Sequence, residues 1–371
     1  MSPNDPTAAA ARLDGLLRAA TSLRISAVAI VPVGSGRYQD AADQVIYEKL
    51  YDSYARGGWV LALLGLFLST FRLIRVLRRL ECRCVVASTP SPFIPFQAML
   101  ASRILNAEYV LDVRDSWEME SFTHSGPLRN RFKKQLEKSC ARSADSVWVV
   151  TATLMERLRT TTGANAARFE LVPNGADPSL FRPTEQEKEI DLLFLGSQAK
   201  YRNVAGVLES LVLVSRLRPH LRAVFVGDGY RPDGDRSSST SAHIEFLPSV
   251  SRTEAARFVA QARLGIVSFS SEDVFRGAIG AKTYEYMATG VPLACLGPSG
   301  HSELRRLVES GNLGFYATSP AEFAEQSSRI LGDEELWRRL SRNCLVASLE
   351  HDRTAISKRA LSSVLRRLSE G

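Results

Sequence analysis

The sequence predicts an α/β protein made of two halves, each built around a parallel β-sheet. Short apolar runs rich in Val, Ile and Phe alternate with longer helical segments along the 371 residues. An order of strand, helix and strand implies parallel strands. A polar segment, residues 181–189, separates the two halves. This length is enough for two domains of ordinary size, and 45% hydrophobic with 23% charged residues describes a globular protein.

The strands of both halves follow from the apolar runs. In the first half, strands are expected at residues 23–33, 83–89, 107–115, 145–151 and 169–174. In the second half, they are expected at residues 190–196, 222–229, 244–249, 264–270 and 292–297. Continuous apolar runs of this kind are typical of strands that are buried on both faces.

The most informative segment is residues 277–292, GAIGAKTYEYMATGVP, where a glycine-rich loop leads into a short helix. Gly277 and Gly280 let the backbone approach a ligand closely. The helix, expected to begin near Ala281, directs unpaired N–H groups and a partial positive charge toward it. Lys282 adds a formal charge, and Glu285, one turn further on, can accept hydrogen bonds from vicinal hydroxyls. Phosphate plus ribose is therefore the expected ligand.

Composition narrows the class of protein. Five cysteines are few and odd in number, and the N-terminus is polar and acidic, which favours a reduced, cytoplasmic protein. Cys82 and Cys84 lack the spacing and the second ligand pair of a zinc site, so no metal site is predicted. The net charge of +7 favours anionic partners. Nucleic acid is not expected among them, because no recognised motif accompanies the basic residues.

Residues 59–80 combine an apolar run with a cluster of arginines. Ten apolar residues, 59–68, are too few to span a bilayer, which takes about 20. The adjoining helix carries Arg72, Arg75, Arg78 and Arg79. Two interpretations are open: a helix lying on an anionic membrane surface, at the inner face of the cell membrane, or a core helix that continues into a solvated face.

Five segments in fixed order, residues 171–183, 191–203, 223–233, 243–270 and 282–292, resemble the C-terminal part of family-4 retaining glycosyltransferases. The resemblance implies the GT-B fold, with two Rossmann-like domains facing each other across a cleft. It implies an acceptor-binding domain at 1–180, a nucleotide-sugar-binding domain at 190–350, and a last helix, 351–371, that crosses back to the first domain.

The resemblance also assigns a donor site. Gly196 ends a strand, and Lys200 and Arg202 behind it grip the diphosphate, with Arg202 the better match in spacing. Glu285 binds the ribose. The base lies against the backbone of Leu247, Ser249 and Val250, and the remaining donor contacts come from Gly277, Ala278, Gly280 and Lys282.

Two residues of the donor site depart from the family pattern. Ser197 replaces an arginine, so one diphosphate contact is expected to be weaker or to be supplied instead by Lys200 or Lys282. Gly277 replaces a glutamate, so the sugar hydroxyls must be held by the backbone amides of residues 277–281, or by Glu272 or Asp273 slightly upstream.

An acceptor site is expected at the carboxyl ends of the strands in the first half. Arg114 stands where many relatives carry a histidine; it cannot act as a base at neutral pH but can pair with a carboxylate or an anionic acceptor. Asp115 is the preferred polar contact to the acceptor. The catalytic set is therefore Asp115, Arg114 and Arg202, and the further acceptor contacts are Ser88, Thr89, Asp112, Glu118 and His124.

The start of the chain fits the family least well. Relatives begin with a strand that is central in the first sheet, whereas this chain begins with a helical segment before residues 23–33. Either residues 23–33 take the central place, or residues preceding Met1 belong to the natural protein. We favour an incomplete N-terminus, because a sheet without its middle strand leaves unpaired edges in the core.

The expected function is transfer of a sugar from a UDP- or GDP-sugar to an acceptor hydroxyl with retention of anomeric configuration. The acceptor is expected to be a lipid-linked saccharide or a small natural product. No cofactor and no obligatory metal are expected, because basic residues and a helix end replace Mg²⁺ at the diphosphate. The alternatives are a GT-B nucleotide-sugar 2-epimerase and an inactive homologue that serves as a binding subunit.

Overall fold

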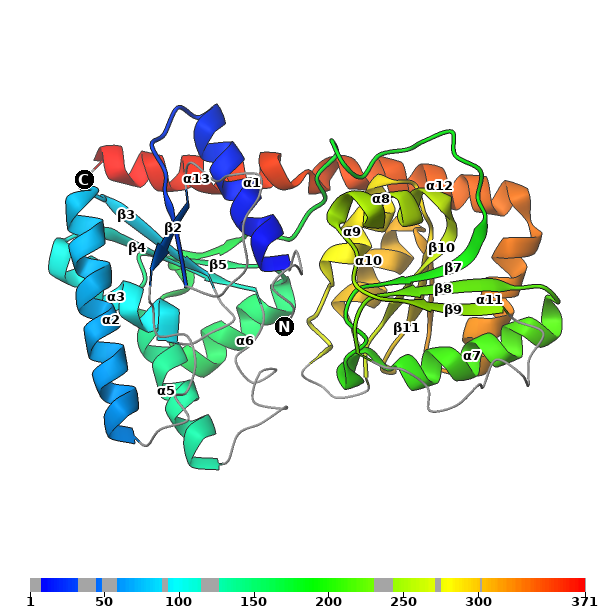
Figure 1. Ribbon diagram of the computed structural model, residues 1–371, viewed down its shortest axis with the longest axis horizontal. Coiled ribbons are helices and arrows are strands. Elements are labelled where there is room, and N and C mark those ends of the chain that lie inside the picture. The colour runs from blue at the N-terminus through cyan, green and yellow to red at the C-terminus, as the bar shows by residue number, and fades with distance from the viewer. Residues whose placement is uncertain are drawn as a thin grey trace. The chain divides into compact units, whose positions relative to one another are not determined.

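The structure is a computed structural model that describes residues 8–32, 45–48, 59–88, 93–114, 127–229, 243–270, 275–300 and 302–370. It divides into two compact units. The first is Met1–Pro173 together with Thr354–Gly371, and the second is Asn174–Arg353. Each unit holds one main parallel sheet with helices on both faces (Figure 1). Two Rossmann-like α/β units are therefore present, as the sequence predicted.

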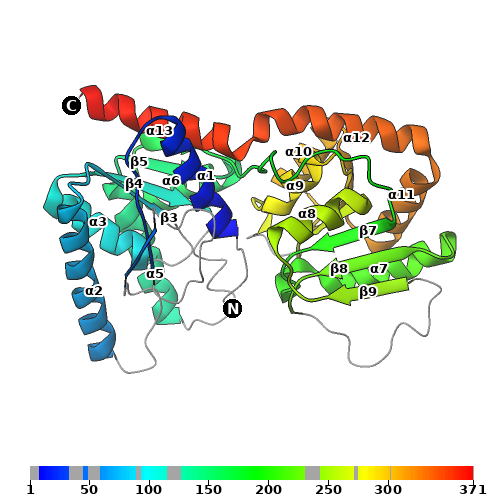
Figure 2. The ribbon, with the colours of Figure 1, turned by 45° about the horizontal axis from the view of Figure 1, so that its top comes forward.

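The main sheet of the first unit has four parallel strands, in the order β3 (Cys84–Ser88), β4 (Glu108–Val113), β5 (Ser146–Val149) and β6 (Phe169–Leu171). Alternate side chains point to opposite faces. Tyr109 and Leu111 pack on the side of α3 (Phe93–Leu105), α5 (Pro127–Ser143) and α6 (Ala152–Thr162). Val110 and Trp148 pack on the side of α13 (Arg353–Glu370), with α1 (Ala8–Ser22) nearby (Figure 2).

Residues 23–33 do not take the central place in this sheet. Only β1 (Ala29–Pro32) of that segment is a strand, and it pairs in parallel with β2 (Val45–Glu48), which the sequence did not predict. The two form a separate two-stranded sheet. Because β1 forms its strand pairing with β2, the expectation that residues 23–33 take the central place in the first sheet is wrong.

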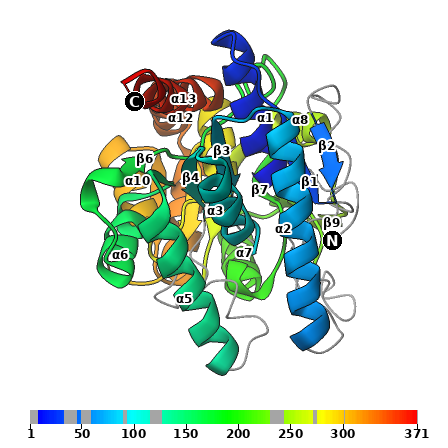
Figure 3. The same cartoon turned by 90° about the vertical axis from the view of Figure 1, so that its left-hand side faces the viewer.

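The apolar run and the arginine cluster of residues 59–80 form one continuous helix, α2 (Trp59–Arg79). One of its faces packs on α3, where Leu73 and Leu77 are buried against Ala101. Side chains of the opposite face lie exposed along the helix, which runs beside α3 in Figure 3: Leu64, Phe67, Leu68, Phe71, Arg72, Arg75, Arg78 and Arg79. None of the described helices combines the length and apolar character that crossing a membrane requires.

The sheet of the second unit has six parallel strands. Their order is β12 (Gly314–Ala317), β11 (Leu293–Leu296), β10 (Ala262–Ser268), β7 (Ile190–Leu195), β8 (Arg222–Val226) and β9 (His243–Leu247). The sequence predicted five of these strands and missed β12. The chain order reverses between β7 and β10, so this pair is the topological switch point at which open α/β sheets bind ligands.

Helices cover both faces of this second sheet. One face packs against α7 (Val204–Leu217), α11 (Pro320–Gly332) and α12 (Glu334–Ser348). The remaining helices are α8 (Arg252–Gln261), α9 (Ala281–Ala288) and α10 (Glu303–Gly311). The helix expected to begin near Ala281 is therefore confirmed as α9.

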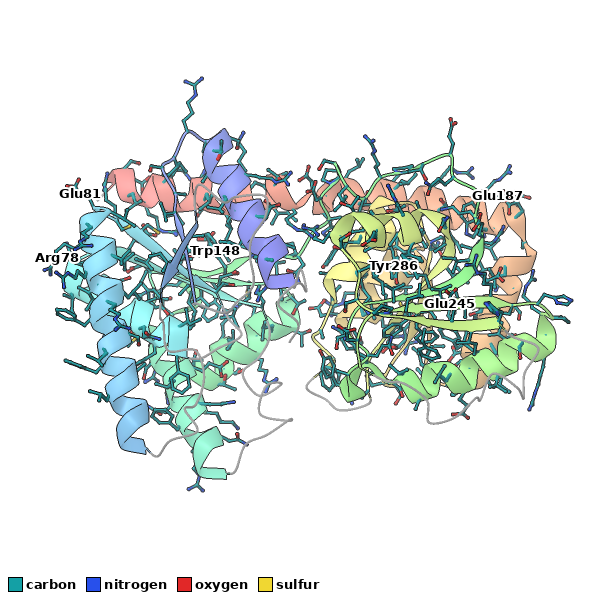
Figure 4. All side chains as sticks on the ribbon, in the orientation of Figure 1. Arg78, Glu81, Trp148, Glu187, Glu245 and Tyr286 are labelled. Atoms are coloured by element: carbon teal, nitrogen blue, oxygen red, sulfur yellow. The ribbon has the colours of Figure 1, made fainter. Side chains whose placement is uncertain are left out.

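Tyr286 fixes α9 to the switch point. Its side chain is fully buried, and its ring lies over Gly265 of β10, where an added Cβ would come within 2.5 Å of the ring. Its hydroxyl donates to the carbonyl oxygen of Leu193 (2.9 Å) and accepts from the amide of Leu195 (3.1 Å), both on β7. One side chain thus joins α9 to both strands of the pair, and Figure 4 shows it inside the second unit.

The units divide a few residues before the boundary expected from the sequence. Residues 174–180 lie in the second unit, because the amide of Ala176 donates to His351 (3.0 Å) and Arg353 donates to the carbonyl of Gly175 (2.8 Å). Gly175 permits this approach, since an added Cβ would lie 2.3 Å from the His351 oxygen. The last helix, α13, packs its apolar side on Val110 and Trp148 of the first unit.

We expect Tyr286→Phe to destabilise the second unit by about 1 to 3 kcal/mol, because it removes the acceptor of the buried Leu195 amide without opening a cavity. Chemical denaturation measures the change. Amide hydrogen exchange at Leu195 should accelerate selectively, while amides of the first unit keep their wild-type rates. Equal acceleration throughout the second sheet would contradict a local role for the hydroxyl.

Candidate functional site

The candidate site lies at the carboxyl ends of β7 and β10. Gly196 follows β7 in a positive-φ conformation (108°), and the loop after β10 leads to Gly280, the N-cap of α9. No side chain of the described residues caps this helix start, so its first N–H groups are available to a ligand. The sequence prediction that a glycine-rich loop and a helix start share one place is confirmed by α9.

Arg202 is held over aromatic rings and pairs with no carboxylate of the described residues. It ends the 3-10 helix Lys200–Arg202, and its guanidinium lies 4.8 Å from the ring centre of Phe269 and 5.1 Å from that of Tyr201. Its own carbonyl accepts from the hydroxyl of Ser268 at the end of β10. The buried Nε and Nη1 atoms donate to no other residue in the described part of the chain. A positioned cation with unused donors is suited to bind an anion.

Lys282 lies on the first turn of α9, and only 7% of it is exposed. Its Nζ is 4.1 Å from the ring centre of Phe194 and has no hydrogen-bond partner among the described residues. Two glycines bring the cations together. A Cβ at Gly280 would lie 3.4 Å from Nη1 of Arg202, and one at Gly196 would lie 3.5 Å from Nζ of Lys282.

Arg202, Lys282 and the start of α9 together form a basic site. Neither Arg202 nor Lys282 makes an ion pair with any described residue, and both adjoin the positive end of α9. Burial, and then the neighbouring charge of Arg202, lowers the pKa of Lys282 well below its usual value. The predicted donor residues Gly196, Gly280, Lys282 and Arg202 are thus brought together. The side chain of Lys200 lies outside the described residues, and Ser197 is exposed.

Glu285 stands one turn beyond Lys282 with 13% of its side chain exposed. Its carboxylate lies 3.6 Å from Nη2 of Arg353 and 3.9 Å from Nη2 of Arg252. The two arginines orient the carboxylate at the edge of the site. Sequence reasoning did not find Arg252 or Arg353, because both are remote in the chain and belong to no motif.

The remaining donor residues follow β9 and β10. Leu247 ends β9, and the amide of Ser249 donates to Oδ1 of Asp228 (3.2 Å), with Val250 half-buried next to it. After β10, the amide of Ala278 donates to the carbonyl of Phe275 (3.0 Å), so the turn itself uses this amide. Gly277 belongs to the same turn, whereas Glu272 and Asp273 lie outside the described residues.

The expected acceptor residues are only partly described. Asp112 is fully buried, and both of its oxygens are used: Nη2 of Arg12 donates at 2.9 Å and the hydroxyl of Ser88 at 2.9 Å. Arg12, 3% exposed, also donates to the carbonyls of Val172 and Pro173. Asp112 and Ser88 therefore join α1 to β4 and β3 in the structure.

Arg12 was missed because an arginine in a helix gives no sign of a partner that lies 100 residues away in the sequence. Arg114 is buried at the end of β4. Asp115, Thr89, Glu118 and His124 lie outside the described residues, and their assignment stays a prediction.

Family models match nearly the whole chain. A model described as glycosyl transferase 4-like domain matches residues 7–175, and one described as glycosyl transferases group 1 matches residues 177–344. No curated protein sequence matches the chain.

Solved structures share the fold. HepE from Anabaena, solved with UDP-glucose, superposes with a TM-score of 0.74 at 14% identity, over 98% of this chain and 97% of that one. Sucrose-phosphate synthase from Thermosynechococcus elongatus gives 0.73 at 15% identity, over 96% and 92%. A putative UDP-N-acetylglucosamine 2-epimerase from Listeria monocytogenes gives 0.63 at 13% identity, over 97% and 95%.

We expect Arg12→Ala to destabilise the first unit by about 3 to 5 kcal/mol, because it leaves the buried Asp112 carboxylate without its cation. The matched control is Arg18→Ala on the same helix. Arg18 pairs with Asp14 at the surface (3.0 Å), and such a pair contributes about 0 to 1 kcal/mol. Chemical denaturation followed by circular dichroism compares the two. Equal effects of both substitutions would show that Arg12–Asp112 does not hold the unit together.

Proposed function

Because the chain belongs to the glycosyltransferases that join a glycosyl transferase 4-like domain to a group 1 domain, we propose that it moves a sugar from a nucleoside-diphosphate sugar to an acceptor hydroxyl with retention of anomeric configuration. The observation that carries the proposal is the pair of basic side chains, Arg202 and Lys282, at the start of α9, which no side chain of the described residues caps. A diphosphate supplies the acceptors and the negative charge that these groups lack.

The proposed mechanism assigns positioning and charge to the protein. The bond between the anomeric carbon and the phosphate oxygen breaks, and the nucleoside diphosphate leaves with the electron pair. Arg202 and Lys282 stabilise the charge that develops on it. The acceptor oxygen bonds to the anomeric carbon on the same face, and its proton passes to the departing phosphate oxygen. Glu285, oriented by Arg252 and Arg353, accepts hydrogen bonds from the ribose hydroxyls.

The choice of donor is guided by the neighbours. HepE was solved with UDP, with UDP and glucose, and with UDP-glucose, which makes UDP-glucose the first donor to test here. GDP-sugars belong in the same panel, because the base is proposed to lie along the backbone of residues 247–250. No obligatory metal is proposed, since two cations and a helix end already face the diphosphate.

Radiolabelled UDP- and GDP-sugars test the function directly. Transfer to an acceptor, or slow hydrolysis of the donor, supports the transferase, and NMR of the product determines whether the anomeric configuration is retained. Release of a 2-epimer would support an epimerase instead, and nucleotide binding without turnover would support an inactive homologue. Full activity in EDTA is expected.

We further propose that the first unit works at the inner face of the cell membrane on a lipid-linked or otherwise amphiphilic acceptor. Phe67 and Phe71 of α2 are 69% and 58% exposed, and four arginines follow on the same side. Exposed aromatic and aliphatic side chains beside a row of cations suit an anionic lipid surface. A small natural product remains the alternative acceptor if lipid is not bound.

We expect Arg202→Ala and Glu285→Gln each to weaken binding of the nucleoside diphosphate about ten- to hundredfold, the effect of losing one charge-assisted hydrogen bond. Calorimetry with UDP and GDP measures it. Arg305→Ala and Glu309→Gln are matched controls, since these residues pair with each other at 2.8 Å on the surface of α10. Unchanged affinity in both site variants would contradict the assignment of the donor site.

We expect the wild-type protein to sediment with vesicles of anionic lipid more than with neutral ones. Replacing Phe67 and Phe71 together by Ser should reduce binding at least about tenfold, because two aromatic side chains no longer enter the interface. Leu217→Ser is the matched control, as Leu217 is 60% exposed on the second unit. A folded wild-type protein that sediments with neither kind of vesicle would leave a soluble acceptor as the proposal.

A further inference from the structure

Lys282 sits in surroundings that suit an amine better than an ammonium ion. The face of the Phe194 ring beneath its Nζ attracts a positive charge but offers no hydrogen-bond acceptor. No described residue accepts a hydrogen bond from Nζ either. The backbone of Gly196 is also close, since a Cβ added there would lie 3.5 Å from Nζ. A buried ammonium ion without an acceptor is costly, so such a group tends to lose its proton.

The charged groups that act on Lys282 do not compensate for this. Arg202 faces it from the 3-10 helix and disfavours a second positive charge. Glu285, on the same helix α9, favours the charge, but its carboxylate is shared with Arg252 and Arg353. Burial is the largest effect, and together with Arg202 it lowers the pKa of Lys282.

We propose that Lys282 is uncharged in the free protein and takes up a proton when a nucleoside diphosphate binds, so that donor binding and protonation are coupled. This inference rests on the proposed function and adds to it a role for one residue. The diphosphate supplies the missing acceptor and cancels the repulsion from Arg202. An ammonium ion then stands beside the phosphate before the sugar leaves.

The direction of the pH dependence follows from the two states of the lysine. Binding raises the pKa of Lys282, so the complex holds one more proton than the free protein at any pH between the two pKa values. In that window, nucleotide affinity should fall by up to about tenfold per pH unit as the pH rises. Below the pKa of the free protein, Lys282 is already charged and this dependence disappears.

Calorimetry of UDP binding in buffers with different ionisation enthalpies counts the protons taken up. Between about pH 7.5 and 9.5 the terminal phosphate, with a second pKa near 6, is already ionised. We expect up to about one proton per UDP for the wild-type protein. Lys282→Arg stays charged in both states and should bind UDP without uptake. Lys282→Met cannot titrate and should show weaker binding without uptake; it also serves if the larger arginine prevents folding.

Lys188→Arg is the matched control. The pKa of Lys188 is also lowered by burial, to about 8. Its Nζ, however, donates to the carbonyl of Ala260 (2.7 Å). Lys188 precedes β7 and therefore lies at the opposite end of this strand from Gly196. Its replacement should leave proton uptake unchanged. UDP binding to the wild-type protein without uptake, or with the same uptake in Lys282→Met, would overturn the inference and leave the proposed function standing. Absence of binding by both UDP and GDP would overturn both.

Discussion

The docking of α9 through Tyr286 is the constraint on which the candidate site depends. The strands β7 and β10 are neighbours in the sheet. From this pair the later strands are added outward in opposite directions, β8 and β9 beside β7, and β11 and β12 beside β10. A helix side chain can contact both strands only where no strand side chain blocks it. Gly265 of β10 has no side chain, and the Tyr286 ring occupies that space. The hydroxyl then bonds to the backbone of β7 on either side of Phe194. The start of α9 is thereby fixed against Gly196, and the position of Lys282 follows.

The second requirement is that no carboxylate of the described residues pairs with the two basic side chains of the site, Arg202 and Lys282. Aromatic rings from three segments, those of Tyr201, Phe269 and Phe275, stack on one another and support the Arg202 guanidinium in place of a carboxylate. Glycines at 196 and 280 keep side chains out of the space between Arg202 and Lys282. An arrangement of this kind is less stable on its own than one with paired charges, and an anionic ligand makes up the difference.

Sequence reasoning was strongest where the chemistry is local. The start of α9, the strand before Gly196 and the two cations lie in short segments whose glycines and charges show their role directly. Sequence reasoning failed where the partner of a residue is distant in the sequence. Asp112 looked like a ligand contact because it stands near the end of a strand, and nothing in the sequence pairs it with Arg12. The strand β12 is four residues long with no alternating pattern, and its place at the sheet edge is set by β11. Arg252 and Arg353 meet Glu285 only in the folded unit.

The contacts of Arg12 also bear on how the chain is made. Arg12 bonds to Asp112 and to the carbonyls of Val172 and Pro173, which lie 100, 160 and 161 residues later. On a ribosome that adds about 5 to 20 residues per second, the last of these partners is synthesised roughly 8 to 30 s after Arg12. The helix α13, which covers the same face of the sheet, begins only at Arg353 and is synthesised later still. The first unit thus remains open on that face until α13 has been synthesised, a period in which a chaperone can bind its exposed strands.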